Sequence, residues 1–399
     1  MLEINVPSPH SAKDSLMGYL YQCRYALYDS LRRLSQKESF AVSVEALDDV
    51  VFQKSDDALD LLQTKHHINR KGNLSDASTD IWKTIRNWSE LLIAGKVPSG
   101  SIFFLVTTET AAENSIAFAL SADTDKRDVD KAISTLFSIS QSSTNKQNKP
   151  GYETFNALSA EQMRLLVNSI IVLDGQPVMS DLDSAMRREL FYAVEPRFIE
   201  PFVIRLEAWW LRRIYQQIEI KNDHPILSEE LLEETSQLRE QFKQENLPID
   251  DDILNASFDE NSTLNSIFVH QLQLIAIGNR RIYFAMRDYY RAFRQRTRWV
   301  NDELLFVGDT DRYEERLKEE WELRFEQMKD ELGEQAAEEQ KIIAAQSLYK
   351  WIENETLPAI RPIVTEPSIA KGSYHMLANE LKVGWHPEFL ERLRQAIRV

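Results

Sequence analysis

The sequence predicts an α+β protein with two parts: a mixed β-sheet flanked by helices in residues 1–185, and an all-α region in residues 186–399. Two observations support this division. Short segments rich in β-branched and aromatic residues lie near the N-terminus, where polar turns separate them. After residue 186, apolar residues recur at helical spacing almost throughout. The core of the first part covers about residues 12–110.

Length and composition fit two globular domains. The chain has 399 residues, of which 43% are hydrophobic and 28% are charged. No stretch approaches the roughly 20 apolar residues of a membrane helix, and the N-terminus lacks the basic and apolar regions of a signal peptide. We therefore expect a cytoplasmic protein that does not enter a membrane. The single cysteine, Cys23, excludes a disulfide framework and a cysteine-based zinc site within one chain.

The formal net charge of −16 argues against indiscriminate binding of nucleic acid, because surfaces that bind phosphate are usually basic. A protein of this charge that acts on DNA needs a local basic patch, or partners that deliver the DNA to it. The sequence contains no G-x-x-x-x-G-K-[ST] motif, so any ATPase activity would belong to a partner.

Residues 42–65 predict a β-hairpin and a third strand. Two apolar segments enclose a group of carboxylates, and a further apolar segment, residues 59–65, follows a polar turn. The carboxylates are Glu45, Asp48 and Asp49. Such a hairpin would carry its acids on one arm, close to the third strand.

Side-chain alternation brings the polar residues of this region together. Gln63 and Lys65 are two apart on the third strand and therefore share a face. Glu45 and Asp49 are four apart and share a face if their strand continues through them. We expect these four side chains to converge across the sheet. Asp48 ranks below Asp49 because neighbouring residues of a regular strand point to opposite sides.

This set of residues fits phosphodiester cleavage with a hard divalent cation, Mg²⁺ or Mn²⁺. Mg²⁺ takes oxygen ligands, usually one or two carboxylates together with waters and phosphate oxygens. Asp49, Gln63 and Glu45 are therefore the candidate metal ligands. A metal lowers the pKa of its bound water and neutralises charge on the scissile phosphate. The Lys65 ammonium can stabilise the attacking hydroxide and the developing negative charge, so all four residues are candidate catalytic residues.

Helices and one more strand complete the predicted core of the first part. Apolar residues recur at helical spacing over residues 11–35 and 79–94, and residues 102–107 form a continuous apolar strand of the buried kind. His66 and His67 leave the third strand on opposite faces, so they cannot chelate one metal together. We interpret these two histidines as DNA or solvent contacts.

A polar region separates the two predicted parts. Residues 138–151 are rich in Ser, Asn and Lys and predict an exposed loop or linker. Ser159 and Gln162 match a capping box at the start of a short helix, and residues 169–173 could add one more strand. We place the domain boundary near Ala185.

The C-terminal part contains an arginine-rich helical segment, residues 279–300, in which aromatic residues alternate with the arginines. Its seven arginines are Arg280, Arg281, Arg287, Arg291, Arg294, Arg296 and Arg298. A helix of this kind could track DNA. Residues 302–340, however, hold fifteen acids and five bases, which favours ion pairs between neighbouring helices or a subunit contact.

The motif E-x-x-D-D followed by Q-x-K resembles the PD-(D/E)xK nuclease superfamily, with glutamine in the D/E position. The segments MGYLYQCRYAL, VEALDDVVF, LLQTKHH, IWKTIRNW and FFLVTT, in this order, are similar to the double-stranded-DNA nuclease domain of bacterial antiphage effectors. The resemblance implies a restriction-endonuclease-like fold, a divalent metal and double-stranded DNA as substrate. It also implies an amide or acid on the first helix beside the metal and DNA, for which Gln22 is the candidate.

A second resemblance covers the C-terminal part. The segments YEERLKEEWELRF, SLYKWIENE, GSYHMLANELKVGWHPEFLERL and FIEPFVIRLEAWWLRRI resemble the C-terminal domains of ABC three-component systems, the class that includes Lamassu. With the nuclease domain, this implies the effector subunit of a Lamassu-type antiphage system. Such an effector is held inactive by an SMC-like ATPase and a small third subunit, and on release it self-associates through its helical domain.

Other interpretations remain. A nuclease gated by a cyclic oligonucleotide would need an α/β ligand-binding domain, which the helical C-terminal pattern does not predict. A non-catalytic DNA-binding scaffold is opposed by the presence of Asp49, Gln63 and Lys65 together. His375 and His386 lie in the C-terminal part without carboxylates at ligand spacing, so we interpret them as hydrogen-bonded structural residues instead of a second metal site.

Overall fold

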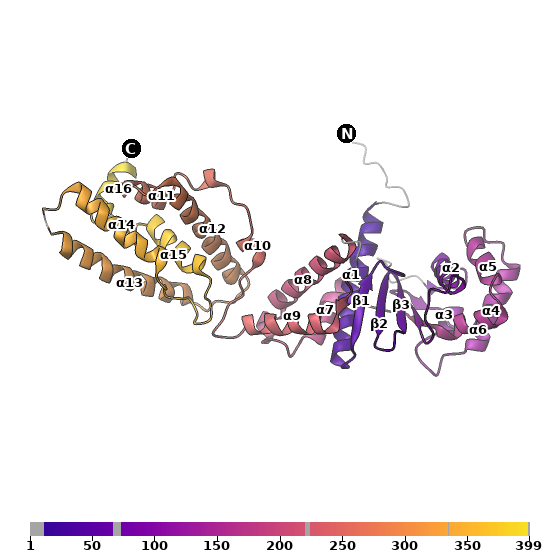
Figure 1. The fold of residues 1–399 in the computed structure, drawn as a ribbon. Coiled ribbons are helices and arrows are strands. Elements are labelled where there is room, and N and C mark those ends of the chain that lie inside the picture. The colour runs from indigo at the N-terminus through magenta and orange to yellow at the C-terminus, as the bar shows by residue number, and fades with distance from the viewer. Residues whose placement is uncertain (1–11, 67–72, 220–223, 334, 398–399) are drawn as a thin grey trace, which may run out of the picture. The chain divides into compact units, whose positions relative to one another are not determined.

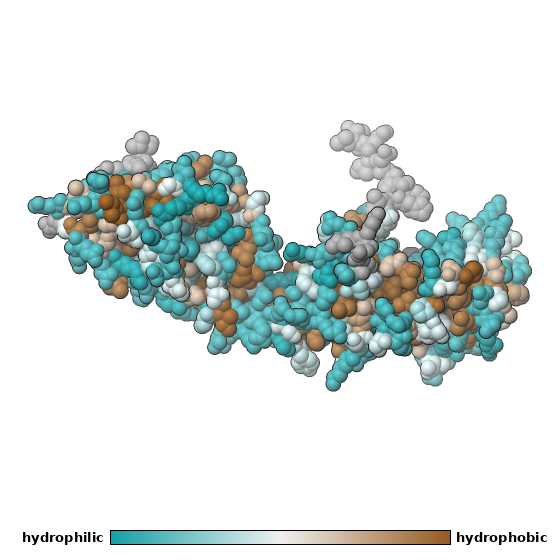
Figure 2. Space-filling view, viewed as in Figure 1, coloured by the Kyte–Doolittle hydropathy of each residue, from teal (hydrophilic) through white to brown (hydrophobic). Residues whose placement is uncertain are grey.

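The computed structural model describes residues 12–66, 73–219, 224–333 and 335–397, and it divides into two compact units, Met1–Ser236 and Gln237–Val399 (Figure 1). None of the helices within the described ranges combines the length and the apolar character that a membrane crossing requires. The face of each unit seen in Figure 2 is mainly hydrophilic, with hydrophobic residues in separate groups.

A six-stranded mixed sheet forms the centre of the first unit, in the order β7-β5-β3-β2-β1-β8. Neighbouring strands from β3 through β2 and β1 to β8 are antiparallel, and β3, β5 and β7 are parallel. The strands are β1 (Phe40–Val44), β2 (Val50–Lys54), β3 (Leu59–Lys65), β5 (Ile102–Thr107), β7 (Ile170–Leu173) and β8 (Ile226–Leu227), and the short β4 (Asn73–Leu74) and β6 (Thr110–Ala111) form a separate pair. The strands predicted at residues 102–107 and 169–173 are thereby confirmed.

Helices cover both faces of this sheet (Figure 1). They are α1 (Ala12–Ser35), α2 (Thr79–Ile93), α3 (Ile116–Ala119), α4 (Val129–Ser142), α5 (Lys149–Asn156), α6 (Ala160–Ser169), α7 (Met179–Glu189), α8 (Ile199–Glu219) and α9 (Ser228–Gln241). On one face, Leu61, Phe103 and Leu105 of the strands pack against Trp82 and Trp88 of α2 and against α3 to α6. Helices α1 and α8 pack on β1. Burial of these large apolar side chains is the main stabilising contribution to the unit.

The predicted loop at residues 138–151 is shorter in the structure, because α4 continues to Ser142. The side chain of Asp128 caps the start of this helix by accepting a hydrogen bond from the Lys131 amide. Ala132 and Leu136 are fully buried and fix the helix on the core. The serine-rich composition had suggested a loop, but the Ser142 hydroxyl donates to the Ser138 carbonyl within the helix.

The division between the units falls after Ser236, whereas the sequence predicted a boundary near Ala185. Three contacts attach the intervening segment to the sheet unit. The Trp210 indole N–H donates to the Cys23 carbonyl at 2.8 Å. The Gln217 amide bonds both the Val44 N–H and the Val42 carbonyl, and β8 pairs with β1. The helical pattern of this segment is real, but its apolar face packs on the first unit.

In the second unit, every regular element that the structure describes is a helix. These are α10 (Asp251–Leu254), α11 (Ile267–Leu274), α12 (Asn279–Asn301), α13 (Asp309–Leu332), α14 (Glu338–Asn354), α15 (Pro367–Asn379) and α16 (Phe389–Ile397), with the one-turn helix η2 (Glu260–Ser262). Helices α12 and α15 lie in close contact at Gly372, where an added Cβ would come within 2.0 Å of the Asp288 carbonyl oxygen. Only glycine permits this approach.

Candidate active site

The carboxylates of the predicted hairpin lie in the loop that joins β1 to β2, not on a continuous strand. Glu45 has a φ of 57°, in the left-handed region, and its N–H donates to the Asp49 carbonyl at 2.9 Å. This turn ends the ladder at Val44 and Val50, the last pair of β1 and β2. The expected alternation of faces therefore does not apply, and the loop decides where Glu45, Asp48 and Asp49 point.

The Asp49 carboxylate is fastened to β3. Its Oδ2 accepts hydrogen bonds from the Thr64 N–H at 2.8 Å and from the Thr64 hydroxyl at 3.0 Å. Thr64 is the middle residue of the Gln63-Thr64-Lys65 sequence and is 7% exposed. The loop carboxylate is thus held at the strand end that carries the amide and the ammonium.

Gln63 is the most enclosed member of the set, with 5% of its surface exposed. Its Oε1 accepts a hydrogen bond of 3.3 Å from the Asn87 amide of α2. Gln63 and Lys65 share the strand face of Leu59 and Leu61, which packs toward α2. The sequence therefore predicted correctly that the amide and the lysine share a face.

A cleft of about 640 Å³ joins these residues. Gln22, Glu45, Asp49, Gln63 and Lys65 all line it, so the structure brings together five of the seven predicted site residues. Asp48 also lines the cleft. A second wall comes from α2 and the turn that follows it, with Lys83, Asn87, Glu90, Leu91, Ala94 and Lys96.

The sequence prediction missed this second wall. Lys83, Asn87, Leu91 and Ala94 follow each other at spacings of three or four residues, on the side of the helix away from the buried face that includes Ile81, Ile85 and Trp88. Such spacing shows that these residues share a face, and it does not show that the face borders a site. The position of α2 against β3 supplies that information.

Negative charge is crowded at the cleft. Burial raises the pKa of Glu45, and the neighbouring Asp49 carboxylate raises it further. Burial also raises the pKa of Asp48 to about 6, although the Trp88 indole N–H donates to its Oδ2 at 2.6 Å. A group of acids that resist ionisation together favours a bound cation, which would relieve their repulsion.

The donor atoms fit a hard divalent cation. Glu45 and Asp49 offer carboxylate oxygens, and Gln63 offers an amide oxygen with a second lone pair beyond the Asn87 bond. Gln22 hydrogen-bonds Glu45 through its side chain, while its Oε1 is buried and has no hydrogen-bond partner within the described residues. A buried amide oxygen without a donor is costly, and a cation or its water in the cleft would satisfy it.

Of the two histidines predicted to contact DNA, the structure describes only His66. His66 is not among the residues that line the cleft; its ring lies 4.6 Å from the Tyr21 ring, centroid to centroid. His67 lies outside the described residues.

The arginine-rich helix α12 forms ion pairs with neighbouring helices, as the acidic composition of residues 302–340 had suggested. Arg281 pairs with Glu353, Arg287 with Asp288, Arg296 with Glu314 of the acidic helix α13, and Arg298 with Asp252. Arg291 donates to the Leu254 carbonyl, and Arg280 and Arg294 lie over aromatic rings. Four of the seven guanidinium groups are thus ion-paired among the described residues, three of them with carboxylates outside α12.

The expectation that His386 has no carboxylates at ligand spacing is corrected. Ligand atoms of Glu338, His386 and Glu388 lie within 4.8 Å of one another. The two carboxylates are already paired with Arg392, and Glu388 also with Lys341. The His386 Nδ1 accepts from the Glu388 N–H at 3.1 Å, so the neutral ring carries its proton on Nε2, toward Glu338. This cluster is an ion network between α14 and α16.

Two family models match separate parts of the chain. Residues 13–163 match the family model of the Cap4 dsDNA endonuclease domain. Residues 268–393 match the model of C-terminal domain 7 of the ABC-three component (ABC-3C) systems. A search of the curated proteins gives no match.

Among solved structures, the chain is similar to the Cap4 SAVED/CARF-domain containing receptors of Moraxella osloensis and of Acinetobacter baumannii, the latter with the cyclic trinucleotide 3'3'3'-cAAA. The first is 15% identical with a TM-score of 0.34, over 70% of this chain and 68% of that chain. The second is 15% identical with a TM-score of 0.32, over 70% of this chain and 69% of that chain.

The Cap4 match supports the PD-(D/E)xK-like fold expected from the sequence. A divalent metal requirement follows from that nuclease domain, and partner ATPase components follow from the ABC-3C match. The two matches together indicate a double-stranded-DNA endonuclease that serves as the effector of an ABC three-component antiphage system.

Proposed function

We propose that the cleft cuts double-stranded DNA with Mg²⁺ or Mn²⁺, and that Asp49, Gln63, Lys65 and Glu45 are its catalytic residues. The observation that carries this proposal is the attachment of Asp49 to Thr64, which places a carboxylate beside the Gln63 amide and the Lys65 ammonium in one cleft. Asp49, Gln63 and Glu45 would hold the cation, with Gln22 beside it.

Each side chain has a separate task. When bound, the cation supplies charge neutralisation at the scissile phosphate and acidifies a water. Lys65 orients the attacking water and stabilises the negative charge that develops on the phosphate oxygens. Asp49 and Glu45 would hold the cation at the position where it binds the phosphate. Thr64 keeps the Asp49 carboxylate from rotating away.

A supercoiled-plasmid assay tests the proposal. The full chain is incubated with Mg²⁺, Mn²⁺ or EDTA, next to Lys65→Ala, Asp49→Ala and the remote control Lys146→Ala. We expect EDTA to stop cleavage and each of the two site variants to lose on the order of 10²-fold or more of the rate. Full activity of Lys65→Ala would overturn the assignment. Unchanged melting of the variants would show that the loss is not a loss of fold.

For regulation, we propose a Lamassu-type arrangement. An SMC-like ATPase and a small third subunit hold the chain inactive, and release allows self-association through residues 186–399. Two active sites facing one duplex, which a symmetric dimer provides, would then cut both strands. Helix α8 supports this step because Ile204, Ala208, Leu211, Tyr215 and Ile218 are exposed at alternating spacings of four and three residues. That spacing is typical of a helix seam that packs against another helix.

Substitutions on this seam test the assembly step. Leu211→Glu together with Tyr215→Glu should keep the full chain monomeric in sedimentation experiments and lower plasmid cleavage, while the buried face of α8 with Trp210 is untouched. A double variant that assembles and cuts like the wild type would rule out α8 as the contact.

The rival functions have less support. Gating by a cyclic oligonucleotide requires an α/β ligand-binding domain, whereas the described part of residues 237–399 contains helices only. A non-catalytic scaffold would need neither the cation nor Lys65. The plasmid assay separates this alternative, because a scaffold binds DNA and does not cut it.

A further inference from the structure

We propose that Lys83 and Lys96, on the α2 wall of the cleft, bind backbone phosphates of the DNA on either side of the cleavage site. This inference rests on the proposed function and extends it, because these residues are not among the catalytic set. It also answers the question of how a chain with a net charge of −16 holds a polyanion.

Helix α2 and the turn after it fix the backbone positions of both lysines. Lys83 lies one turn before Asn87 on α2, and both line the cleft. Lys96 follows the helix in a Schellman turn: the Gly95 N–H donates to the Leu92 carbonyl, and the Lys96 N–H donates to the Leu91 carbonyl, each at 3.1 Å. Gly95 has a φ of 65°, which this turn requires. The turn directs the chain back so that Lys96 also lines the cleft.

The charge of these lysines is available. Within the ranges that the structure describes, neither Lys83 nor Lys96 forms an ion pair, and the same holds for Lys65. Glu90, the acid on the same wall, is paired with Arg86 at 3.5 Å. An exposed lysine that has no ion pair to break can neutralise a DNA phosphate at little cost, and the counterion of that phosphate is then released.

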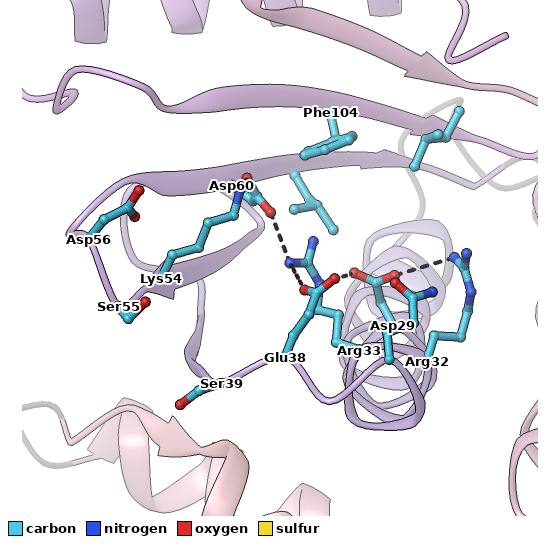
Figure 3. A pocket seen from close by; sticks show the side chains of 13 residues that line it. Asp29, Arg32, Arg33, Glu38, Ser39, Lys54, Ser55, Asp56, Asp60 and Phe104 are labelled. Carbon is cyan, nitrogen blue, oxygen red and sulfur yellow. Dashed lines mark hydrogen bonds and ion pairs between the residues drawn. The ribbon is translucent and has the colours of Figure 1, made fainter.

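A second hollow of the same unit provides the contrast. Figure 3 shows this pocket of about 560 Å³, in which Arg33 points to Asp60 and Arg32 to Asp29. Lys54 lies 2.8 Å from Asp60, and Arg33 also pairs with Asp29 and Glu38. The cations that line this pocket are paired with acids of the same pocket, so it offers no charge to a polyanion.

The acids and the lysines come from different elements that line one cleft. The acids Glu45, Asp48 and Asp49 lie on the loop side of the cleft, where a cation would offset them. Lys83 and Lys96 line the same cleft from the α2 wall, so a DNA backbone bound there would present its scissile phosphate to the cation and neighbouring phosphates to the lysines. Contacts of this kind position the backbone without reading the sequence.

Binding of a short fluorescent duplex to the full chain tests the inference, with Ca²⁺ in place of Mg²⁺ to suppress cleavage. Affinity is measured over a series of salt concentrations for the wild type, for Lys83→Gln and Lys96→Gln singly and together (the double Gln variant), and for the control Lys146→Gln. A further variant combines Lys83→Arg with Lys96→Arg (the double Arg variant). We expect the double Gln variant to bind on the order of tenfold more weakly, with a salt slope reduced by about 2. The double Arg variant should restore most of the affinity, and the control should match the wild type.

Cleavage kinetics with Mg²⁺ add a second readout. The double Gln variant should raise KM for the duplex and leave kcat nearly unchanged, because the catalytic residues remain. Wild-type affinity and an unchanged salt slope in this variant, while Lys65→Ala has lost cleavage, would overturn the inference and leave the proposed function standing. A wild-type chain that neither binds nor cuts the duplex would overturn both.

Discussion

Helices α2 and α12 both present basic side chains, but the partners of those side chains differ. On α12, Arg281, Arg296 and Arg298 are paired with carboxylates of other helices. On the α2 wall, Lys83 and Lys96 form no ion pair among the described residues and border the cleft that holds the crowded acids. Five of the seven arginines of α12 are engaged by acids or by a carbonyl, so α12 is the poorer candidate for DNA binding although it has more basic residues.

For DNA binding, charge that is available matters more than the number of basic residues. A guanidinium in a buried pair contributes to folding, and moving it to a phosphate would leave its carboxylate buried and uncompensated. An exposed lysine carries no such cost. Four substitutions test how individual side chains contribute to binding and stability.

The largest effect is expected from the α12 pair of Arg296 and Glu314, in which the arginine is 5% exposed. Arg296→Met should lower the free energy of unfolding by about 3 kcal/mol, because Glu314 then keeps only its longer ion pair with Lys382, at 3.5 Å. Urea unfolding of the full chain measures the loss. The double variant Arg296→Met with Glu314→Leu should recover most of the stability. Single and double variants of equal stability would show that the pair is not coupled.

On the α2 side, Asn87→Leu removes the hydrogen bond to the Gln63 amide. We expect affinity for Mn²⁺, measured by calorimetry without DNA, to fall about 10- to 100-fold, as for other groups that orient a metal ligand. Lys83→Gln, one turn away on the same helix, should not lower this affinity. If both variants weakened metal binding equally, the positioning and phosphate-binding roles on α2 could not be separated.

A pH-dependent effect is expected in the second unit. His375 is 2% exposed between Phe268 and Tyr349, and burial lowers its pKa to about 3. Between this value and the unfolded pKa of about 6.5, only the unfolded state binds the proton, so stability is full above pH 6.5 and is lost as the pH falls. The loss approaches about 1.4 kcal/mol per pH unit. His375→Leu should make melting temperatures less dependent on pH between 7 and 5, and an equally steep dependence would contradict this role.

The smallest effect is expected from the exposed arginine Arg294, which lies over the Tyr290 ring at 5.8 Å. Arg294→Gln should change the free energy of unfolding by less than about 0.5 kcal/mol. It should also leave the salt slope of DNA binding unchanged, in contrast to Lys83→Gln. A slope reduced as much as by Lys83→Gln would contradict the distinction between the two helices, because α12 would then contact DNA as well.

Much of the first unit could be predicted from local patterns. The strand at residues 102–107 agrees with the structure, and the helix predicted at residues 79–94 is α2, Thr79–Ile93. Both have strong apolar periodicity, which depends on near neighbours only. The paired faces of Gln63 and Lys65 follow from the same alternation.

The loop carboxylates could not be placed in this way. Five residues between Val44 and Val50 can continue a strand or turn back, and Glu45 turns by adopting a left-handed φ that its residue type does not favour. Thr64 then receives Asp49 through both its N–H and its hydroxyl. These are contacts between segments, which local spacing does not encode.

The sequence by itself determined the α+β fold class, the set of oxygen donors with its lysine, and the need for a local source of positive charge, because composition, periodicity and residue chemistry are properties of the chain. The tertiary structure placed α8 in the sheet unit, paired four of the seven arginines of α12 with acids, and brought Lys83, Asn87 and Lys96 to the cleft that the acids line. Each of these depends on which surfaces pack together, and packing joins residues that are far apart in the sequence.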